Sequence, residues 1–378
     1  MHRVQLAYTL GDAAASRQSS GGAAEPALHH PLLALLAAVH GSGSISAAAR
    51  QLGLSYRHVW GELKRWEAEL GQPLVVWVKG QPALLAPFGE KLLWSERRAL
   101  ARLAPQIEAL RNELERAFAL AFDDSAGVLT MAASHDEALP RLRDWLARHN
   151  NLHLDLQFTG GADAVGALAA LNDGRCLLAG FHAITEARLR SPTARTYRAL
   201  LKPGKHKLIG FARRRQGLMV AAGNPLAIHS LHDLARDGVR FVNGPHGSGT
   251  RVVLEELLAA ARVGLEEVNG FDRAERSHAA AAEAVASGSA DAAFGTEPMA
   301  QAKGLHFIGL AEEQYFLVTL AATLEHPHVK GLLATLQSEA WRATLDAIPG
   351  HAAERCGEVL SLRKVLPWWN YRKPKHAA

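Results

Sequence analysis

The chain has 378 residues, more than one ordinary hydrophobic core can organise, so two or three domains are expected. Apolar residues make up 48% and charged residues 21%, which excludes an intrinsically disordered protein. The net charge of +5 permits nucleic-acid binding but does not by itself indicate it.

Three features bear on where the protein works. The first residues lack a basic stretch followed by an apolar run and a small-residue cleavage site, so no secretory signal is expected. No window offers about 18 uninterrupted apolar residues, so no membrane span is expected. Cys176 and Cys356 lie far apart, which fits a reducing compartment and excludes a disulfide framework. The sequence therefore predicts a cytoplasmic protein with no membrane partner.

Residues 1–29 read as a short strand followed by a flexible Gly/Ser/Ala-rich segment, and residues 30–89 read as a DNA-binding domain. Three helices are predicted there: Pro31 opens the first, Ser44 caps the second and Ser55 caps the third. A short helix, a tight glycine-containing turn and a longer helix form a helix-turn-helix, whose second helix enters the major groove. Two short β-rich runs follow, as a hairpin wing requires. The prediction is a winged helix-turn-helix rich in α-helix.

The N-terminal turn of the third helix is the part that meets base edges in this arrangement. Arg57 lies there and is the best candidate for reading a base, because its guanidinium can fork onto guanine. Lys64 and Arg65 lie further along and are expected to contact phosphates. The predicted DNA-binding residues are Ser44, Ser55, Tyr56, Arg57, His58, Lys64, Arg65 and Lys79.

Residues 90–126 are predicted to be a linker, with one long helix over 90–122. Leucines and other apolar residues recur there at a spacing near 3.5 residues, between charged flanks. A long amphipathic helix beside a DNA-binding domain indicates dimerisation; a solitary helix that bridges two domains is the alternative.

From residue 127 the pattern changes to strands alternating with helices, which predicts an α/β domain with a parallel sheet over 127–365. A second alternation is nested inside it at about 210–305. Such nesting is typical of a two-lobed binding domain with a crossing-over hinge. Arg213, Arg214 and Arg215 are predicted to face solvent at that hinge, and residues 366–378 to form a tail.

Three segments of this domain are predicted to bind an anion by the same physical means. Ser134 follows a strand and precedes a helix, Ser248 lies in the loop 247–251 ahead of another helix, and Ser277 precedes a third. A helix start presents unpaired backbone N–H groups and a partial positive charge, which stabilise an anion. The alternative is that each serine only caps its helix. The loop 247–251 is the segment that most favours anion binding over simple capping, because two glycines flank its serine and it contains no acidic residue.

Several side chains near these segments have two open interpretations. His135, His182 and His278 lie at strand ends or helix starts, where they contact the ligand or make structural hydrogen bonds. Arg251 pairs with a ligand charge or with Glu255, one turn later. The histidines lack the short spacing of a zinc pair, so no metal or other cofactor is predicted. Tyr315 provides a hydroxyl to the cleft or fills the core. The predicted ligand-binding residues are Ser134, His135, Gly180, His182, Gly247, Ser248, Gly249, Thr250, Arg251, Ser277, His278 and Tyr315.

The run GSGSISAAARQLGLSYRHVWGELKRWEAELGQPLVVWVKGQPALLAPFGEKLL resembles the winged helix-turn-helix of LysR-type regulators. Through Ser55-Tyr56-Arg57 and Trp60 it is still more similar to that of the molybdate-responsive ModE regulators. The segments AASHDEAL, LLAGFH, NGPHGSGTR, RSHAAAAEAVASGSADAAFG and GLHFIGLAEEQYFLV resemble periplasmic-type substrate-binding domains related to molybdate- and tungstate-binding proteins. The sequence departs from ModE in lacking its small molybdate-binding β-barrel modules.

The resemblance implies a type II, periplasmic-binding-protein-like effector domain and a homodimer or homotetramer formed through the 90–122 helix. It also implies that the chain binds double-stranded promoter DNA under the control of an oxyanion effector, molybdate or tungstate. Formate or another small carboxylate is the rival effector, because regulators of this architecture serve molybdenum-enzyme operons. An enzyme is not predicted, since no GxSxG elbow occurs and no third residue would orient a serine–histidine pair. A transport binding protein is disfavoured by the missing export signal and by the DNA-binding domain.

Overall fold

The computed structural model describes residues 30–77, 82–122, 127–134, 136–158, 164–184, 191–275, 277–366 and 368. The chain divides into two compact units, Met1–Leu100 and Ala101–Ala378, and the helix α4 (Pro87–Phe122) runs through the boundary. Two predicted site residues, Lys79 and His135, lie outside the described residues.

The first unit holds the predicted winged helix-turn-helix. Its helices are α1 (Pro31–Ser42), α2 (Ile45–Gln51) and α3 (Tyr56–Leu70), and its hairpin pairs β1 (Val75–Val76) with β2 (Leu84–Leu85) in antiparallel fashion. The predicted caps are confirmed, because Ser44 Oγ accepts from Ala47 N at 3.3 Å and Ser55 Oγ accepts from His58 N at 3.1 Å. A buried core that includes Leu36, Val39, Ala48, Val59 and Leu63 holds the helices together.

The helix α4 is 36 residues long and begins at Pro87, three residues earlier than predicted. Proline suits a first helical turn, where its missing N–H would have no partner in any case. Two of the leucines that set its predicted apolar spacing remain exposed: Leu103 is 43% exposed and Leu110 is 55% exposed.

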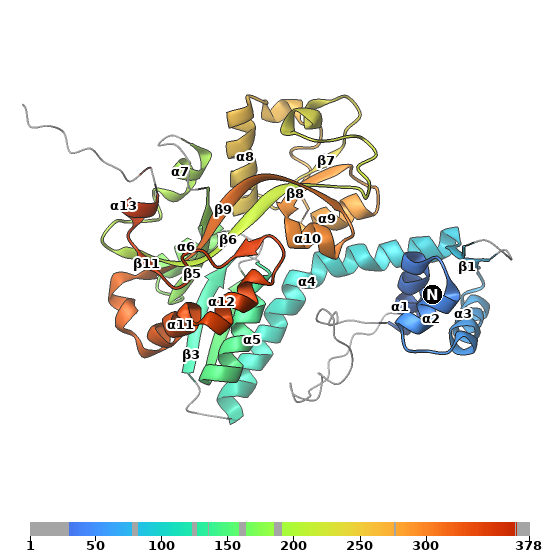
Figure 1. The fold of residues 1–378 in the computed structure, drawn as a ribbon, viewed down its shortest axis with the longest axis horizontal. Helices are drawn as coiled ribbons and strands as arrows, with labels where there is room; N and C mark the ends of the chain where they lie inside the picture. The colour runs from blue at the N-terminus through green and yellow to red at the C-terminus, as the bar shows by residue number, and fades with distance from the viewer. Residues whose placement is uncertain are drawn as a thin grey trace, which may run out of the picture. The chain divides into compact units, whose positions relative to one another are not determined.

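The second unit is built on a nine-stranded mixed sheet, in which seven strands follow the order β4-β3-β5-β9-β6-β8-β7 and two more pair with β6 (Figure 1). The strands are β3 (Gly127–Ala133), β4 (Leu152–Phe158), β5 (Leu178–Ala183), β6 (His206–Val220), β7 (Phe241–Val242), β8 (Ala292–Thr296), β9 (His306–Leu320), β10 (His351–Ala352) and β11 (Val359–Leu360). The helices are α5 (Ala138–Asn150), α6 (Ala164–Asn172), α7 (Pro192–Tyr197), α8 (Gly249–Ala261), α9 (His278–Ala286), α10 (Glu297–Ala302), α11 (Pro327–Gln337), α12 (Glu339–Asp346) and α13 (Leu362–Val365). Short 3-10 turns cover Leu231–Ala235, Leu265–Glu267 and Ala321–Glu325.

The predicted parallel sheet is wrong in part. The strand β3 pairs in parallel with β4 and β5, as does β7 with β8, but β9 pairs antiparallel with both β5 and β6. The reason is that β6 and β9 carry the chain between two lobes in opposite directions, so they run side by side over their whole lengths (Figure 1).

Separate cores define the two lobes of this unit. In the first lobe, α5, α11 and α12 pack on one face of the sheet around Leu142 and Trp341, while α6, α7 and α13 pack on the other face around Phe181. In the second lobe, α8 packs around Phe241 and Phe294 on one face, and α9 packs on the other. The ends of β6 belong to different cores, since Leu208 lies in the first lobe and Leu218 in the second. The two-lobed architecture is therefore confirmed.

Among the described residues, no single helix combines the length and apolar character needed to cross a membrane, although α1 and α2 taken together, bent by 119°, satisfy that test.

Candidate functional site

A buried arginine lies where β6 passes from one lobe to the other. Arg214 sits between two register shifts of the β6–β9 pair, at Gly210/Ala212 and at Gln216/Gly217, and its side chain is 2% exposed. The prediction that all three consecutive arginines face solvent is wrong for Arg214. Arg213 and Arg215 are 39% and 49% exposed, because successive side chains of a strand point to opposite faces.

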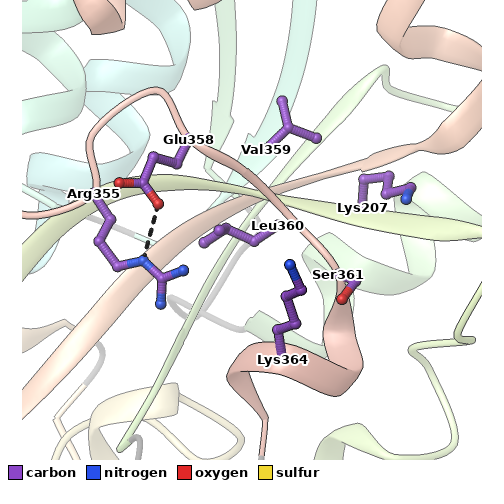
Figure 2. A pocket seen from close by; sticks show the side chains of 7 residues that line it. All are labelled: Lys207, Arg355, Glu358, Val359, Leu360, Ser361 and Lys364. Carbon is purple, nitrogen blue, oxygen red and sulfur yellow. Dashed lines mark hydrogen bonds and ion pairs between the residues drawn. The ribbon is translucent and has the colours of Figure 1, made fainter.

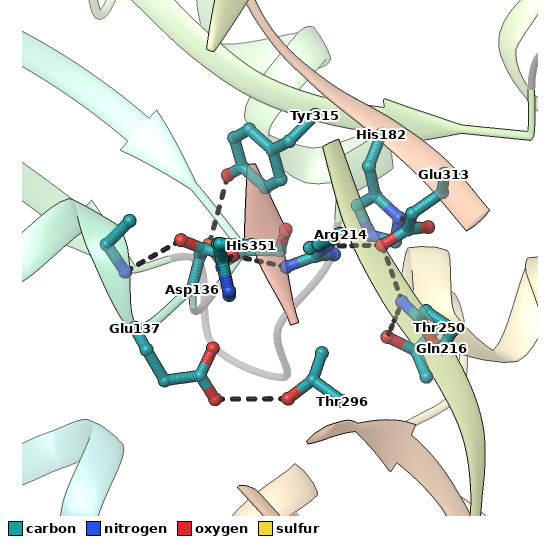
Figure 3. Close-up of polar contacts among 12 residues, drawn as sticks. Asp136, Glu137, His182, Arg214, Gln216, Thr250, Thr296, Glu313, Tyr315 and His351 are labelled. Carbon is teal, nitrogen blue, oxygen red and sulfur yellow. Dashed lines mark hydrogen bonds and ion pairs between the residues drawn. The ribbon is translucent and has the colours of Figure 1, made fainter. Parts of the chain in front are cut away.

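Arg214 is held between two carboxylates (Figure 3). Its Nη1 donates to Asp136 Oδ2 at 2.5 Å, and its Nε donates to Glu313 Oε1. Glu313 also accepts from Gln216 Nε2 at 2.6 Å and lies 2.6 Å from His182 Nδ1. These side chains come from β5, β6, β9 and the segment after β3, so the network ties several strands of the sheet together.

His351 of β10 completes this network, with Nε2 3.3 Å from Asp136 Oδ2. Burial lowers the pKa of His351, but the adjacent Asp136 carboxylate outweighs this and raises it. Burial raises the pKa of Glu313, yet the Arg214 guanidinium, together with the contact from His182, lowers it to about 2. Burial likewise raises the pKa of Asp136, and His351 with Arg214 holds it well below its ordinary range. With His351 protonated, two cations therefore face two carboxylates and the charges balance.

Predicted ligand residues of the first lobe form one wall of this network. The Tyr315 hydroxyl donates to the Ser134 carbonyl at 3.3 Å, and the Arg214 guanidinium lies 4.9 Å from the centre of the Tyr315 ring. Gly180 allows this packing, because a Cβ there would lie 2.1 Å from the Tyr315 hydroxyl. Ser134 Oγ is buried and has no hydrogen-bond partner in the described part of the chain.

Ser134 does not lie at a helix start as predicted. The helix α5 begins at Ala138, and Asp136 Oδ1 accepts from the Ala138 amide at 2.8 Å in the place of a cap. Asp136, which was not among the predicted ligand-binding residues, thus fixes both Arg214 and the first turn of the helix.

The loop 247–251 reaches the network from the second lobe. Thr250 Oγ1 accepts from Gln216 Nε2 at 3.4 Å, and a Cβ on Gly249 would lie 2.1 Å from His182 Nε2. Ser248 caps α8 by accepting from the Arg251 amide at 3.3 Å, and Gly247 has the left-handed φ of 77° that favours glycine. The loop backbone therefore packs directly against the imidazole of His182.

Three predicted ligand residues are engaged elsewhere. Arg251 takes the second of its two interpretations: Nε donates to Glu255 Oε1 at 3.3 Å, and the guanidinium lies over the Phe271 ring. Ser277 caps α9 and donates its hydroxyl to Ala101 O at 2.8 Å. The ring of His278 packs against Gly244, where an added Cβ would lie 2.8 Å from Cε1.

One cluster in the described residues has the spacing that a metal ion needs. Ligand atoms of Asp136, Glu137 and His351 lie within 4.8 Å of one another. Asp136 Oδ2, however, already interacts with Arg214 and His351, so a cation would have to displace both. We interpret these side chains as part of the internal ionic network.

A separate surface hollow of about 500 Å³ lies beside β6 and β11 (Figure 2). Its lining residues are Lys207, Arg355, Glu358, Val359, Leu360, Ser361 and Lys364. Arg355 Nε donates to Glu358 Oε2 at 3.1 Å. The hollow shares no residue with the predicted ligand set.

The DNA-binding candidates of α3 differ in how their charges are engaged. Lys64 pairs with Glu67 at 2.7 Å and Arg65 pairs with Glu62 at 2.5 Å. Arg57 is exposed and has no carboxylate partner among the described residues. Tyr56, 47% exposed, stacks on Trp60 with ring centres 6.5 Å apart. Arg57 is thus the cation of the first turn that is available to a ligand.

Comparison with known families places both units. Residues 143–337 match the family model of the PBP superfamily domain, and residues 31–90 match that of the bacterial regulatory helix-turn-helix protein, lysR family. The chain belongs to the PBP superfamily and carries a lysR-family DNA-binding domain. It is a DNA-binding transcription regulator with an effector domain, and regulators of this type are not enzymes.

Individual relatives of this regulator match different shares of its length. It is 32% identical to the uncharacterized protein YvgK of Bacillus subtilis over 220 residues, 57% of this chain and 70% of that protein. It is 45% identical to the molybdenum-pterin-binding protein MopB of Rhodobacter capsulatus over 86 residues, 22% of this chain and 32% of MopB. The crystal structure of full-length CbnR with its target DNA is similar over 81% of this chain and 98% of CbnR, with 16% identity and a TM-score of 0.41.

Proposed function

We propose that this regulator senses a small oxyanion, molybdate or tungstate, at the buried network around Arg214, and that binding changes its hold on promoter DNA. Two observations carry the proposal. The guanidinium of Arg214 is buried, and Ser134, whose carbonyl accepts from Tyr315 of the same network, has a buried hydroxyl with no partner among the described residues. A buried donor without a partner costs free energy, so a ligand that accepts from it is stabilised.

The surrounding carboxylates determine how an anion would bind. Asp136 and Glu313 already neutralise Arg214, so an incoming anion competes with one of them for the guanidinium. Such competition would release a carboxylate that links β6 to its neighbours and would change the relation between the two lobes. In this proposal the effector acts by replacing one carboxylate as a partner of the Arg214 guanidinium.

The choice of molybdate or tungstate is supported by the 45% identity to MopB, whose name states that it binds molybdenum-pterin. The ModE-like residues Ser55, Tyr56 and Arg57 agree with it. Formate or another small carboxylate is the second candidate. It is favoured by one observation: both groups that Arg214 binds in this structure are carboxylates, whose planar geometry matches the guanidinium fork.

The direct test measures the thermal stability of the full chain with molybdate, tungstate, sulfate, phosphate and formate. A true effector raises the midpoint in a saturable way; a concentration 100-fold above Kd stabilises the fold by about 2.7 kcal/mol. Gel shifts with promoter DNA at several salt concentrations then measure whether the same anion changes operator affinity. Stabilisation by none of the five anions would contradict the proposal.

A matched pair of variants locates the site. Ser134→Ala removes a hydroxyl that bonds nothing within the described fold, so the free chain should keep its stability while the anion shift is lost. Thr193→Val removes another buried and unpartnered hydroxyl, at α7 away from the network, and should leave the anion shift unchanged. An unchanged shift in Ser134→Ala would move the effector site elsewhere.

A further inference from the structure

The helix α4 contains a proline in its interior. Pro105 has no N–H, so the carbonyl of Ala101, four residues earlier, lacks the amide donor that an α-helix normally supplies. Ala101 is 5% exposed, which leaves its carbonyl little access to water. A buried carbonyl in this position needs a donor from another part of the chain.

That donor comes from Ser277. The Ser277 hydroxyl donates to Ala101 O at 2.8 Å. Ser277 Oγ also accepts from the Ala280 amide at 3.1 Å and so caps α9. A second contact lies beside this one on the same turn of α4. Arg102 Nε and Nη2 donate to the two carboxylate oxygens of Glu275 at 3.3 and 3.2 Å. The pair is partly exposed, so its contribution is modest, but its two-point geometry fixes the orientation of the helix.

The segment that holds α4 also borders the loop 247–251. Glu275 N donates to Asn243 O at 3.1 Å and Asn243 N donates to Arg273 O at 2.8 Å, so residues 273–275 run along the strand end that leads into this loop. The neighbouring residue of Ser277, His278, packs its ring against Gly244, and a Cβ at Gly244 would also lie 3.6 Å from Ser248 Oγ. Direct contacts thus connect the loop to the segment that holds Glu275 and Ser277.

We propose that Glu275 and Ser277 form the surface through which the effector domain grips the linker helix of its own chain, with the Ser277 hydroxyl replacing the amide that Pro105 lacks. Its role in signalling rests on the proposed function, since an effector at the network would move this grip together with the loop. Ser277 is then a positioning residue for α4 and not the ligand-binding residue that the sequence predicted.

The test compares hydrogen exchange of the α4 amides around residues 98–110 in full-length chains. Ser277→Gly deletes the hydroxyl yet keeps an acceptable helix N-cap, so exchange there should accelerate on the order of tenfold. Adding Pro105→Ala restores an amide donor for Ala101 O and should return exchange in Ser277→Gly close to that of the Pro105→Ala single variant. Ser191→Gly is the matched control. Ser191 caps α7 by the same kind of hydrogen bond, and among the described residues it makes no hydrogen bond to α4, so the variant should leave exchange in α4 unchanged.

A second measurement separates this proposal from the effector proposal. With molybdate, Ser277→Gly should keep the thermal shift of the wild type but lose the effect of molybdate on operator affinity. Unchanged exchange in Ser277→Gly, or no restoration by Pro105→Ala, would overturn the grip. The absence of a thermal shift in every chain, with exchange still accelerated in Ser277→Gly, would reject molybdate as effector while leaving the grip in place.

Discussion

A buried charge is stabilised only by its partners, and Arg214 has two. Removing one member of such a group leaves the opposite charges buried without compensation, which costs far more than losing a surface ion pair. Asp136 and Glu313 are both fully enclosed, so neither can turn to water when Arg214 is absent. The stability of the second unit should therefore depend strongly on this one side chain.

We predict that Arg214→Gln lowers the free energy of unfolding at pH 7 by about 3–5 kcal/mol. The pKa of Glu313 is about 2 against an ordinary 4.5, so its contribution is present above pH 4.5 and is lost as the pH falls towards 2. Without Arg214 the pKa of Glu313 is lowered less, so this carboxylate takes up a proton at a higher pH than in the wild type. Protonation removes the buried charge that has lost its partner. The deficit of the variant relative to wild type should narrow between pH 7 and pH 4, as measured by urea unfolding.

The neighbouring arginine provides the control. Arg213→Gln removes a cation of the same strand that is 39% exposed and paired with Glu312 and Glu354, so it should cost under about 1 kcal/mol at every pH. A deficit of Arg214→Gln that stays constant with pH would show that lost packing, and not uncompensated charge, is its cause.

At the residue scale the sequence indicated part of the site. Ser134, Gly180, His182, Gly249, Thr250 and Tyr315 were predicted for the ligand site, and the structure places all of them around one network. Asp136, Arg214, Gln216, Glu313 and His351 were missed. The two-residue period of a strand was the available signal, because it places Arg214 and Gln216 on the opposite face from Arg213 and Arg215. The pairing of Asp136 with Arg214, 78 residues apart, has no local signature.

The linker helix α4 presents apolar side chains that this chain does not cover. Leu103 and Leu110 are 43% and 55% exposed and seven residues apart, so they lie on the same helical face. Leucines in this arrangement pack against a second helix in coiled coils. For this reason we propose that the homodimer or homotetramer forms through this helix.

We predict that Leu110→Glu weakens self-association of the full chain by at least about tenfold, because a charge would be buried in the helix pairing. Sedimentation equilibrium over a range of protein concentrations measures the change. Leu226→Glu makes the same substitution at a residue that is 43% exposed outside α4, and should leave association unaltered. Equal association of Leu110→Glu and the wild type would place the interface on another surface.

At the element scale the strands and helices could be predicted, but their directions could not. The alternation after residue 127 gave most of the elements, since apolar periodicity is a local property. Strands that alternate with helices usually run parallel, and this rule failed at β9, which pairs antiparallel with β6 although α8, α9 and α10 lie between the two strands in the chain. The direction of β9 depends on which lobe the chain is leaving, and nothing in its own residues records that.

At the scale of the whole molecule, binding of the proposed effector at the network would be linked to protonation of His351. Asp136 and Glu313 keep their charges at neutral pH, so a bound anion adds further negative charge in a buried place beside this imidazole. That charge favours protonation of the surrounding groups, and binding is then accompanied by proton uptake. Affinity for the effector should consequently rise as the pH falls.

We predict that the Kd for molybdate increases between pH 6 and pH 8 by up to about tenfold per pH unit, the limit for uptake of one proton. Isothermal titration calorimetry at pH 6, 7 and 8 gives the Kd directly. Lys207→Gln, in the separate hollow beside β11, should show the same pH dependence as the wild type. A Kd that does not change with pH would mean that the anion binds away from the network.

The pairing of β6 with β9 has a topological consequence. The pair ends at Val220 opposite His306, so the chain leaves and rejoins the β6–β9 ribbon at adjacent points. Residues 221–305 are therefore inserted at the tip of a β-hairpin, and a two-residue type I′ turn such as Asn-Gly would span the gap in their place. The tip of this hairpin packs in the core of the second lobe through Leu218 and Ile308, so a binding module grafted in place of residues 221–305 must cover these side chains but need not change the strand order.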